Sequence, residues 1–208
     1  MTTSSDGQLL EAYQRGDASA FSRLVEAHQA PLLRHARAVL GEGSAYEDVV
    51  QETFLKLAQK PPSLSREVLG TPELERAQLS SWLHKVTRNL CMDVARSETR
   101  RKRREQEASA TEAAEGGLAV IDETDTRSMV EKQLNRLPVD QREVLVLRLL
   151  GERSYKEIAE ITGKKVGTVG WLVSVGLKTL SRELAPLLEG VSRSGVESTG
   201  GVAQGGLS

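Results

Sequence analysis

Apolar residues recur at intervals of three and four along most of the chain, the spacing typical of amphipathic helices. The first such stripe, from Asp17 to Leu40, consists of Phe21, Leu24, Val25, His28, Leu32, Leu33, Ala36 and Leu40. Asp17 is its expected N-cap and Gly41 its stop. A capping box at Ser44 and Glu47 predicts a second helix, which ends before Pro61-Pro62.

Residues 61–81 have no clear period, so we expect an ordered loop or short helices, with one helical turn starting at Thr71-Pro72. A basic helix is predicted from Ser81. One face of it is apolar, through Leu83, Val86, Leu90 and Val94, and its far end is almost wholly charged.

A second helical block is predicted from about Thr126, after a stretch without enough apolar residues to fold. Pro138 opens a helix over Val139–Leu150 that closes at Gly151. The fold class is therefore all-α, with two small helical domains joined by a flexible linker. The boundaries are 1–104 for the first domain, 105–125 for the acidic linker, 126–189 for the second domain and 190–208 for a disordered tail.

The second domain has the pattern of a helix-turn-helix. Ser154 and Glu157 form a capping box, Ala159 is a small residue where two helices approach, Gly163 suits a turn with positive φ, and Val169 anchors the next helix. That last helix is predicted over 165–188, with an inner stripe of Val166, Val169, Val173, Leu177, Leu180, Leu184 and Leu187.

The net charge of -1 conceals a strong segregation of charge. Residues 82–104 hold eight Lys or Arg against two acids, whereas residues 105–131 hold eight acids against one Arg. Cys91 is the only cysteine, which excludes an internal disulfide and indicates a reducing compartment. No apolar run is long enough to span a membrane and no secretion signal is evident, so we expect a cytoplasmic protein without membrane insertion.

The sequence does not favour an enzyme, and we expect no cofactor and no metal. His28 and His35 lie seven residues apart on one helix face and His84 stands alone, a pattern more typical of satisfied or half-exposed histidines than of ligands. Asp48 and Glu52 lack a third ligand. There is no Gly-rich phosphate loop and no nucleophile with a base at a recognisable spacing.

Three motifs together resemble the extracytoplasmic-function (ECF) class of bacterial sigma factors in the sigma-70 superfamily. Residues 46–57 resemble the polymerase-docking helix of that family, and Trp82-Leu83 with Asn89, Asp93 and Arg96 before an arginine run resembles its minus-ten helix. Residues 137–144, 154–159 and 166–169 resemble its minus-thirty-five domain.

Four residues of the docking helix share the face opposite its apolar stripe: Asp48, Gln51, Glu52 and Leu55. Spacing alone fits either a protein interface or a solvated face. The resemblance implies that this face binds the coiled-coil clamp helices of core RNA polymerase.

The basic helix supplies candidate DNA-binding residues: Lys85, Arg88, Asn89, Arg96, Arg100, Arg101 and Arg103. Their cations can neutralise phosphates, which gives affinity without sequence information. Asn89 either bonds a base or bonds Asp93 on its own helix, and Trp82 is either core or a stacking platform. The resemblance implies that a loop within residues 61–81 captures a base flipped from the minus-ten element, although that segment contains no aromatic residue.

The recognition helix departs from the family pattern because it lacks arginines after Gly167-Thr168-Val169. The candidate DNA-binding residues of this domain are Lys164, Lys165, Thr168, Trp171, Ser174, Lys178 and Arg182. Trp171 either contacts thymine methyl groups, binds a protein or packs as core. Glycines inside a helix are costly, so Gly167, Gly170 and Gly176 indicate close backbone approach.

These observations predict an alternative sigma factor that binds core RNA polymerase and directs promoter recognition and melting. Its expected partners are the polymerase, promoter DNA and an anti-sigma factor. Two alternatives remain open: a helix-turn-helix transcriptional regulator, and a decoy that occupies polymerase without recognising promoters.

Overall fold

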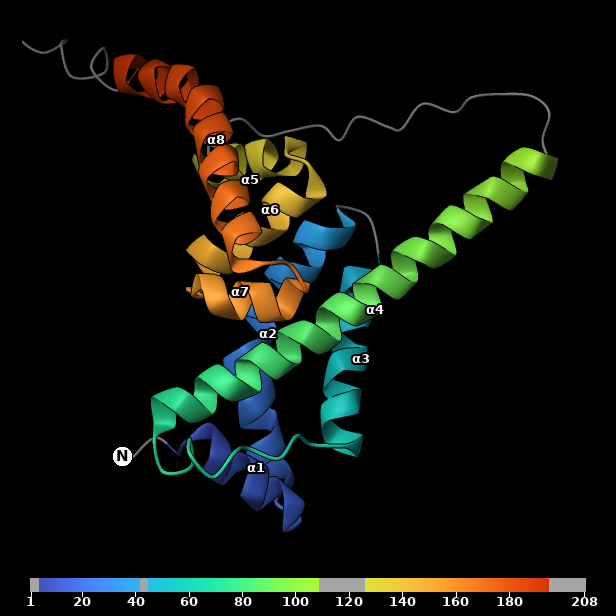
Figure 1. Cartoon of the computed structure of the whole chain (residues 1–208), viewed down its shortest axis with the longest axis vertical. Helices are drawn as coiled ribbons and strands as arrows, with labels where there is room; N and C mark the ends of the chain where they lie inside the picture. Colours follow the sequence, from blue (N-terminus) through green and yellow to red (C-terminus); the bar gives the residue numbers. More distant parts are fainter. Residues whose placement is uncertain (1–3, 42–44, 109–125, 195–208) are drawn as a thin grey trace, which may run out of the picture.

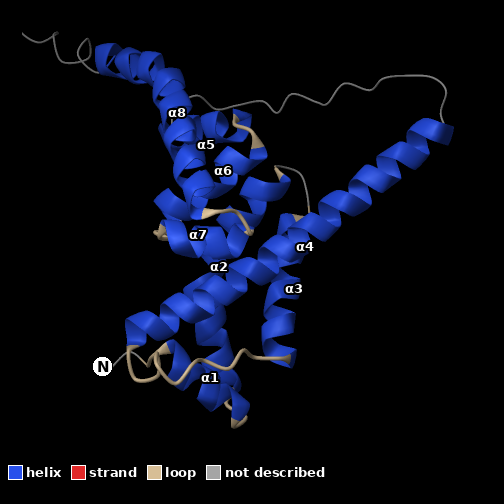
Figure 2. Ribbon diagram, in the orientation of Figure 1, coloured by secondary structure: helices blue, strands red, loops and turns tan. Residues whose placement is uncertain are grey.

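The computed structural model describes residues 4–41, 45–108 and 126–194, and no strand occurs in those ranges (Figures 1 and 2). The first domain contains helices α1 (Asp6–Gln14), α2 (Ala18–Leu40), α3 (Tyr46–Gln59) and α4 (Pro72–Ala108). The second contains α5 (Thr126–Arg136), α6 (Val139–Leu145), a π-helical turn η1 (Val146–Leu150), α7 (Tyr155–Thr162) and α8 (Val166–Ser194). The all-α prediction is confirmed.

The first domain is built around α2, which packs against α1, α3 and α4. As predicted, α2 begins after Asp17, whose carboxylate accepts the Ser19 N–H at 2.9 Å, and ends at Gly41, which has a φ of 88°. The fully buried side chains of the core come from three helices: Leu24, Leu32, Leu57, Leu79 and Leu83.

Helices α1, α3 and α4 of this domain each differ from the sequence prediction. Helix α1 was not predicted, although Ser5 and Gln8 form a complete capping box at its start. The N-cap of α3 is Ala45, which makes no side-chain cap bond, so the predicted capping box is wrong; Ser44 lies outside the described residues.

Helix α4 begins at Pro72, nine residues before the predicted start at Ser81. Proline is favoured in the first helical turn because its missing N–H would have no helical partner there. Leu79 is buried in the core, which explains why the helix pattern extends upstream. The helix also continues to Ala108, past the expected boundary at Arg104, and the rest of the predicted linker, 109–125, lies outside the described residues.

In the second domain α7 and α8 form the predicted helix-turn-helix. The Ser154 and Glu157 side chains cap α7 reciprocally, and Gly163 ends it in the left-handed conformation with a φ of 71°. Apolar residues from α5, α6, η1, α7 and α8 meet in a second core: Leu134, Val144, Leu145, Leu147, Ile158, Val169 and Leu172.

The predicted inner stripe of α8 is only partly right. Val169, Val173 and Leu180 are buried, but Val166 and Leu177 are exposed and Leu172 is buried in their place. Val166 lies at the first position of the helix, beyond the reach of the core. The helix continues to Ser194, past the predicted start of the tail at Gly190; Leu187 lies where side chains are not described, and residues 195–208 lie outside the described residues.

The two domains are packed against each other (Figure 1). Helix α2 contacts α6 and η1, and α4 contacts α7. The sequence predicted two domains on a flexible linker and gave no indication of this direct contact. Of the helices described here, none is long and apolar enough to cross a membrane.

Candidate docking surface and nucleic-acid interface

Helix α3 presents a polar face with one large apolar side chain. Val49, Val50, Phe54 and Leu57 are buried against the core. The four predicted docking residues are all exposed: Asp48, Gln51, Glu52 and Leu55. Leu55 is 53% exposed, and Glu52 pairs with Lys56 at 3.3 Å. The buried stripe therefore packs α3 against the core and leaves these four side chains at the surface.

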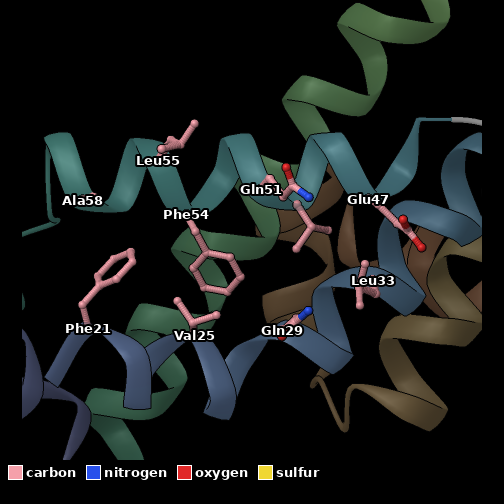
Figure 3. Close-up of a pocket in the computed structure, with 10 residues that line it drawn as sticks. Phe21, Val25, Gln29, Leu33, Glu47, Gln51, Phe54, Leu55 and Ala58 are labelled. Atoms are coloured by element: carbon pink, nitrogen blue, oxygen red, sulfur yellow. The ribbon is translucent and has the colours of Figure 1, made fainter. Parts of the chain in front are cut away.

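A groove of about 540 Å³ runs between α2 and α3 (Figure 3). Phe54 points from α3 toward Phe21 and Val25 of α2, and these side chains form an apolar floor. Gln51 and Leu55 lie at its edge. The predicted docking face is thus continuous with an apolar groove that sequence spacing did not indicate.

Most of the candidate DNA-binding residues of α4 are exposed: Lys85, Asn89, Arg96, Arg100, Arg101 and Arg103. Asp93 bonds Arg96 at 3.1 Å, so the suggested pairing of Asn89 with Asp93 is not observed. Trp82 packs against the first core, which favours the core interpretation over the stacking platform.

Arg88 is the exception on this helix. Its side chain is largely buried, and its Nε donates to Glu143 Oε1 at 2.7 Å across the domain boundary. In this arrangement the Arg88 guanidinium faces a carboxylate of the second domain rather than solvent.

The histidines are buried and bonded. His28 lies 2.8 Å from the Asp6 carboxylate, and His35 lies 3.3 Å from Glu143. His84, which was expected to stand alone, contacts His35 at 3.0 Å. Among the described residues no group of three His, Cys, Asp or Glu side chains is arranged to hold a metal ion.

A second hollow, of about 670 Å³, lies between α1, the segment 61–71 and the start of α4. Its walls include Leu10, Pro62, Ser63 and Leu69. At its base the buried Glu75 carboxylate accepts the N–H groups of Gly7 at 3.0 Å and Gly70 at 2.7 Å. Hydrogen bonds from Ser5 and from these amides lower the pKa of Glu75 despite its burial, so the carboxylate stays charged. Through these bonds it links α1 to the segment that precedes α4.

The outer face of the helix-turn-helix is formed by exposed residues of α8 and of the turn before it: Lys165, Thr168, Trp171, Ser174 and Lys178. Trp171 is 60% exposed, so the interpretation of this residue as core is wrong; its neighbour Leu172 takes the buried position. Lys164 is half-buried and pairs with Asp140 at 2.9 Å, and Arg182 pairs with Glu183 at 3.0 Å.

The predicted close backbone approach is found at one of the three helix glycines. A Cβ on Gly176 would lie 2.9 Å from Leu145 Cδ1, so the buried Leu145 side chain would have to shift to admit one. A Cβ on Gly170 would make ordinary contact with the Tyr155 ring, and Gly167 faces open space.

Comparison with known families assigns both domains. The profile of Sigma-70 region 2 matches residues 24–101, and that of Sigma-70, region 4 matches residues 127–180. The ECF RNA polymerase sigma factor SigM of Mycobacterium tuberculosis is 30% identical over 191 residues, which cover 90% of this chain and 89% of SigM. The chain belongs to the ECF sigma factors.

Other relatives agree with this assignment. The RNA polymerase sigma-H factor of Pseudomonas aeruginosa is 30% identical over 201 residues, which cover 90% of this chain and 98% of the sigma-H factor. The sigma factor RpoE of Bartonella quintana, solved in complex with the anti-sigma factor NepR, superposes with a TM-score of 0.58 at 26% identity, covering 79% of this chain and 96% of RpoE.

The protein is thus an alternative sigma factor, and that prediction is confirmed. Its region 2 match covers most of the first domain, and its region 4 match covers most of the second. Sequence reasoning missed the residues that join the two domains, among them Ser80, Arg142, Glu143 and Arg153. No local pattern indicates these contacts, because they depend on how the domains pack.

Proposed function

We propose that this sigma factor binds core RNA polymerase through the exposed face of α3, holds the melted minus-ten element on α4 and contacts the minus-thirty-five element with the helix-turn-helix. The observation that carries the proposal is the α3 face, on which Asp48, Gln51 and Leu55 are exposed on a helix fixed by a buried apolar stripe. It is supported by the names of the relatives, which are RNA polymerase sigma factors.

The α3 face has the composition of a protein-binding surface. A large apolar side chain within a polar rim is the arrangement in which a few residues carry most of the binding free energy. Leu55 is the anchor in this interpretation, and Asp48, Gln51 and Glu52 provide hydrogen bonds and charge around it. The adjoining groove floor extends the apolar area available to the polymerase clamp.

The proposal is tested by a pull-down with core polymerase. The triple variant Asp48→Ala, Gln51→Ala, Leu55→Ala should lose most of its binding, while its circular dichroism stays unchanged because all three side chains are exposed. A matched triple variant changes an acid, an amide and an exposed leucine outside α3, at Glu73, Gln14 and Leu74. Equal binding by the two triple variants would refute the assignment of the docking face.

On α4, Lys85, Arg96 and the arginines of residues 100–104 are proposed to bind phosphates of the promoter, and Asn89 to bond a base. The hollow beside residues 61–71 is proposed to take the flipped base. Its walls are aliphatic and polar, so such a base would be held by hydrogen bonds and apolar contacts rather than by stacking on an aromatic ring.

On the second domain, Lys165 is proposed to bind a phosphate at the start of α8, where the helix dipole also favours an anion. Thr168, Trp171 and Ser174 would face the major groove, with the indole contacting thymine methyl groups. Lys178 and Arg182 would anchor the helix to phosphates further along the duplex.

The remaining partner is an anti-sigma factor. RpoE, a structural relative, was solved bound to one, and we propose that this chain is regulated in the same manner. The sigma factor would act in the cytoplasm, with no cofactor and no catalytic activity of its own.

A further inference from the structure

The contact between the two domains includes several buried polar and charged groups. The two apolar cores form separate clusters. Between them, Arg142 donates to the backbone oxygen of Ala38, and Arg153 Nη2 donates to Ser80 Oγ at 2.7 Å. Because each domain keeps its own core, separating the domains would break these polar contacts without opening either core.

Four other side chains at this contact form one connected set, which we call the interdomain cluster: His35, His84, Arg88 and Glu143. Glu143 projects from α6 and is 2% exposed. Its Oε1 lies 2.7 Å from Arg88 Nε and 3.3 Å from His35 Nε2. His35 Nδ1 in turn lies 3.0 Å from His84 Nδ1. A carboxylate of the second domain is therefore held entirely by side chains of the first.

The distances place both ring nitrogens of His35 within hydrogen-bonding range, Nε2 toward the Glu143 carboxylate and Nδ1 toward His84 Nδ1. One nitrogen of the His35–His84 pair donates and the other accepts, according to the tautomers of the two rings. The other ring nitrogen of His84, Nε2, is buried without a hydrogen-bond partner. Burial lowers the pKa of His84 well below its ordinary value, helped by the neighbouring His35 and Arg153, so this ring stays neutral.

The carboxylate at the centre stays charged. Burial by itself would raise the pKa of Glu143, but the hydrogen bond from His35 and the charge of Arg88 outweigh it and lower that pKa below its usual value. Glu143 is thus an anion that is stripped of water and paired with the Arg88 guanidinium.

Arg88 lies on the same face of α4 as Lys85, Asn89 and Arg96, which are exposed. A guanidinium binds carboxylate and phosphate with the same geometry and charge. We propose that Glu143 competes with the DNA backbone for Arg88, so that the packed arrangement is autoinhibited and the domains must separate before α4 can use Arg88 on a promoter phosphate. This inference rests on the proposed DNA-binding role of α4.

The interdomain contact is suited to opening. A buried ion pair recovers little more than the cost of removing its charges from water. Two buried nitrogens of this contact, His84 Nε2 and Arg153 Nε, have no hydrogen-bond partner, and such groups add a further cost to the packed state. When the domains separate, a DNA phosphate would pair with Arg88, and water would hydrate the other polar groups of the contact.

The test measures DNA affinity and domain separation with the full chain and no polymerase. Dyes are placed on Ser22→Cys and Ser181→Cys, two exposed positions in different domains, and the probe is a mixed-sequence duplex of about 30 base pairs at low salt. The native Cys91 does not interfere, because burial raises the pKa of its thiol to about 12.

Glu143→Gln should lower energy transfer between the dyes and tighten duplex binding, because losing one charge-assisted hydrogen bond shifts the equilibrium by roughly 10- to 100-fold. Glu160→Gln, which removes the same charge from an exposed position on α7, should change affinity by less than about two-fold. In the double variant Glu143→Gln, Arg88→Ala the gain in affinity should disappear.

A second variant keeps the test decisive if Glu143→Gln lowers the stability of the second domain. Ser80→Ala leaves Glu143 and Arg88 in place but removes the acceptor of Arg153, and should open the domains in the same direction. Unchanged transfer and affinity in both variants would overturn the proposal, as would a gain that persists without Arg88. Because the assay contains no polymerase, these outcomes are independent of whether the α3 docking face is correctly assigned.

Discussion

Replacing Trp171 by alanine separates the effects of this residue on stability and on promoter recognition. The indole is 60% exposed, so about two fifths of roughly 250 Å² is covered by the protein. At ~25 cal/mol/Å² this area gives an upper bound of about 2.5 kcal/mol. The unfolded chain covers part of the same surface, and alanine favours the helix by about 0.5 kcal/mol, so we expect Trp171→Ala to cost about 1 kcal/mol.

The adjacent residue provides the matched control. Leu172 is 6% exposed, and truncating a buried leucine to alanine costs about 2 to 5 kcal/mol. Thermal melting followed by circular dichroism should therefore show a shift for Leu172→Ala at least twice that for Trp171→Ala.

Transcription should show the reverse order once both variants are assayed well below their melting temperatures. If Trp171 contacts a base, its loss costs about 1 to 3 kcal/mol, or roughly five-fold to over a hundred-fold in promoter affinity. Run-off transcription on promoters that vary in the minus-thirty-five element measures this effect. A Trp171→Ala protein that melts like Leu172→Ala, or that transcribes every promoter variant like the parent, would refute the reasoning.

Three further predictions concern other parts of the chain. Lys85→Ala with Arg96→Ala should flatten the log-log salt dependence of DNA binding by about 0.9 for each lost phosphate contact, and a slope equal to the parent's would place both charges in solvent. Gly163→Ala should destabilise the second domain by about 1 to 2 kcal/mol in thermal melts, because the φ of 71° strains any residue with a Cβ; an unchanged melting temperature would contradict this. Cys91 should resist iodoacetamide at pH 8 in the folded protein and react on unfolding, since its raised pKa keeps the thiol protonated; rapid labelling of the native protein would show that it is accessible.

Local sequence signals predicted the elements whose causes are local. The capping box at Ser154 and Glu157, the left-handed turn at Gly163 and the N-cap at Asp17 are each defined by a few neighbouring residues, and all three are present in the structure. The exposed docking face also follows from helix geometry, because the buried stripe of α3 determines which residues remain outside.

Features that depend on tertiary packing were missed or misjudged. The start of α4 at Pro72 is stabilised by burial of Leu79 in a core that the segment itself does not reveal. Arg88 was expected to meet phosphate, but the structure pairs it with Glu143, 55 residues away in the sequence. No periodicity in either segment indicates that contact, since it arises from the packing of two separately formed domains.

The central claim is that this chain directs core RNA polymerase to promoters. The most direct measurement adds the purified protein to core polymerase on fragmented genomic DNA and maps the 5′ ends of the transcripts. The account predicts a limited set of start sites, absent with core polymerase alone, that share minus-ten and minus-thirty-five elements and are lost with the triple variant of Asp48, Gln51 and Leu55. Start sites indistinguishable from those of core polymerase alone would contradict it.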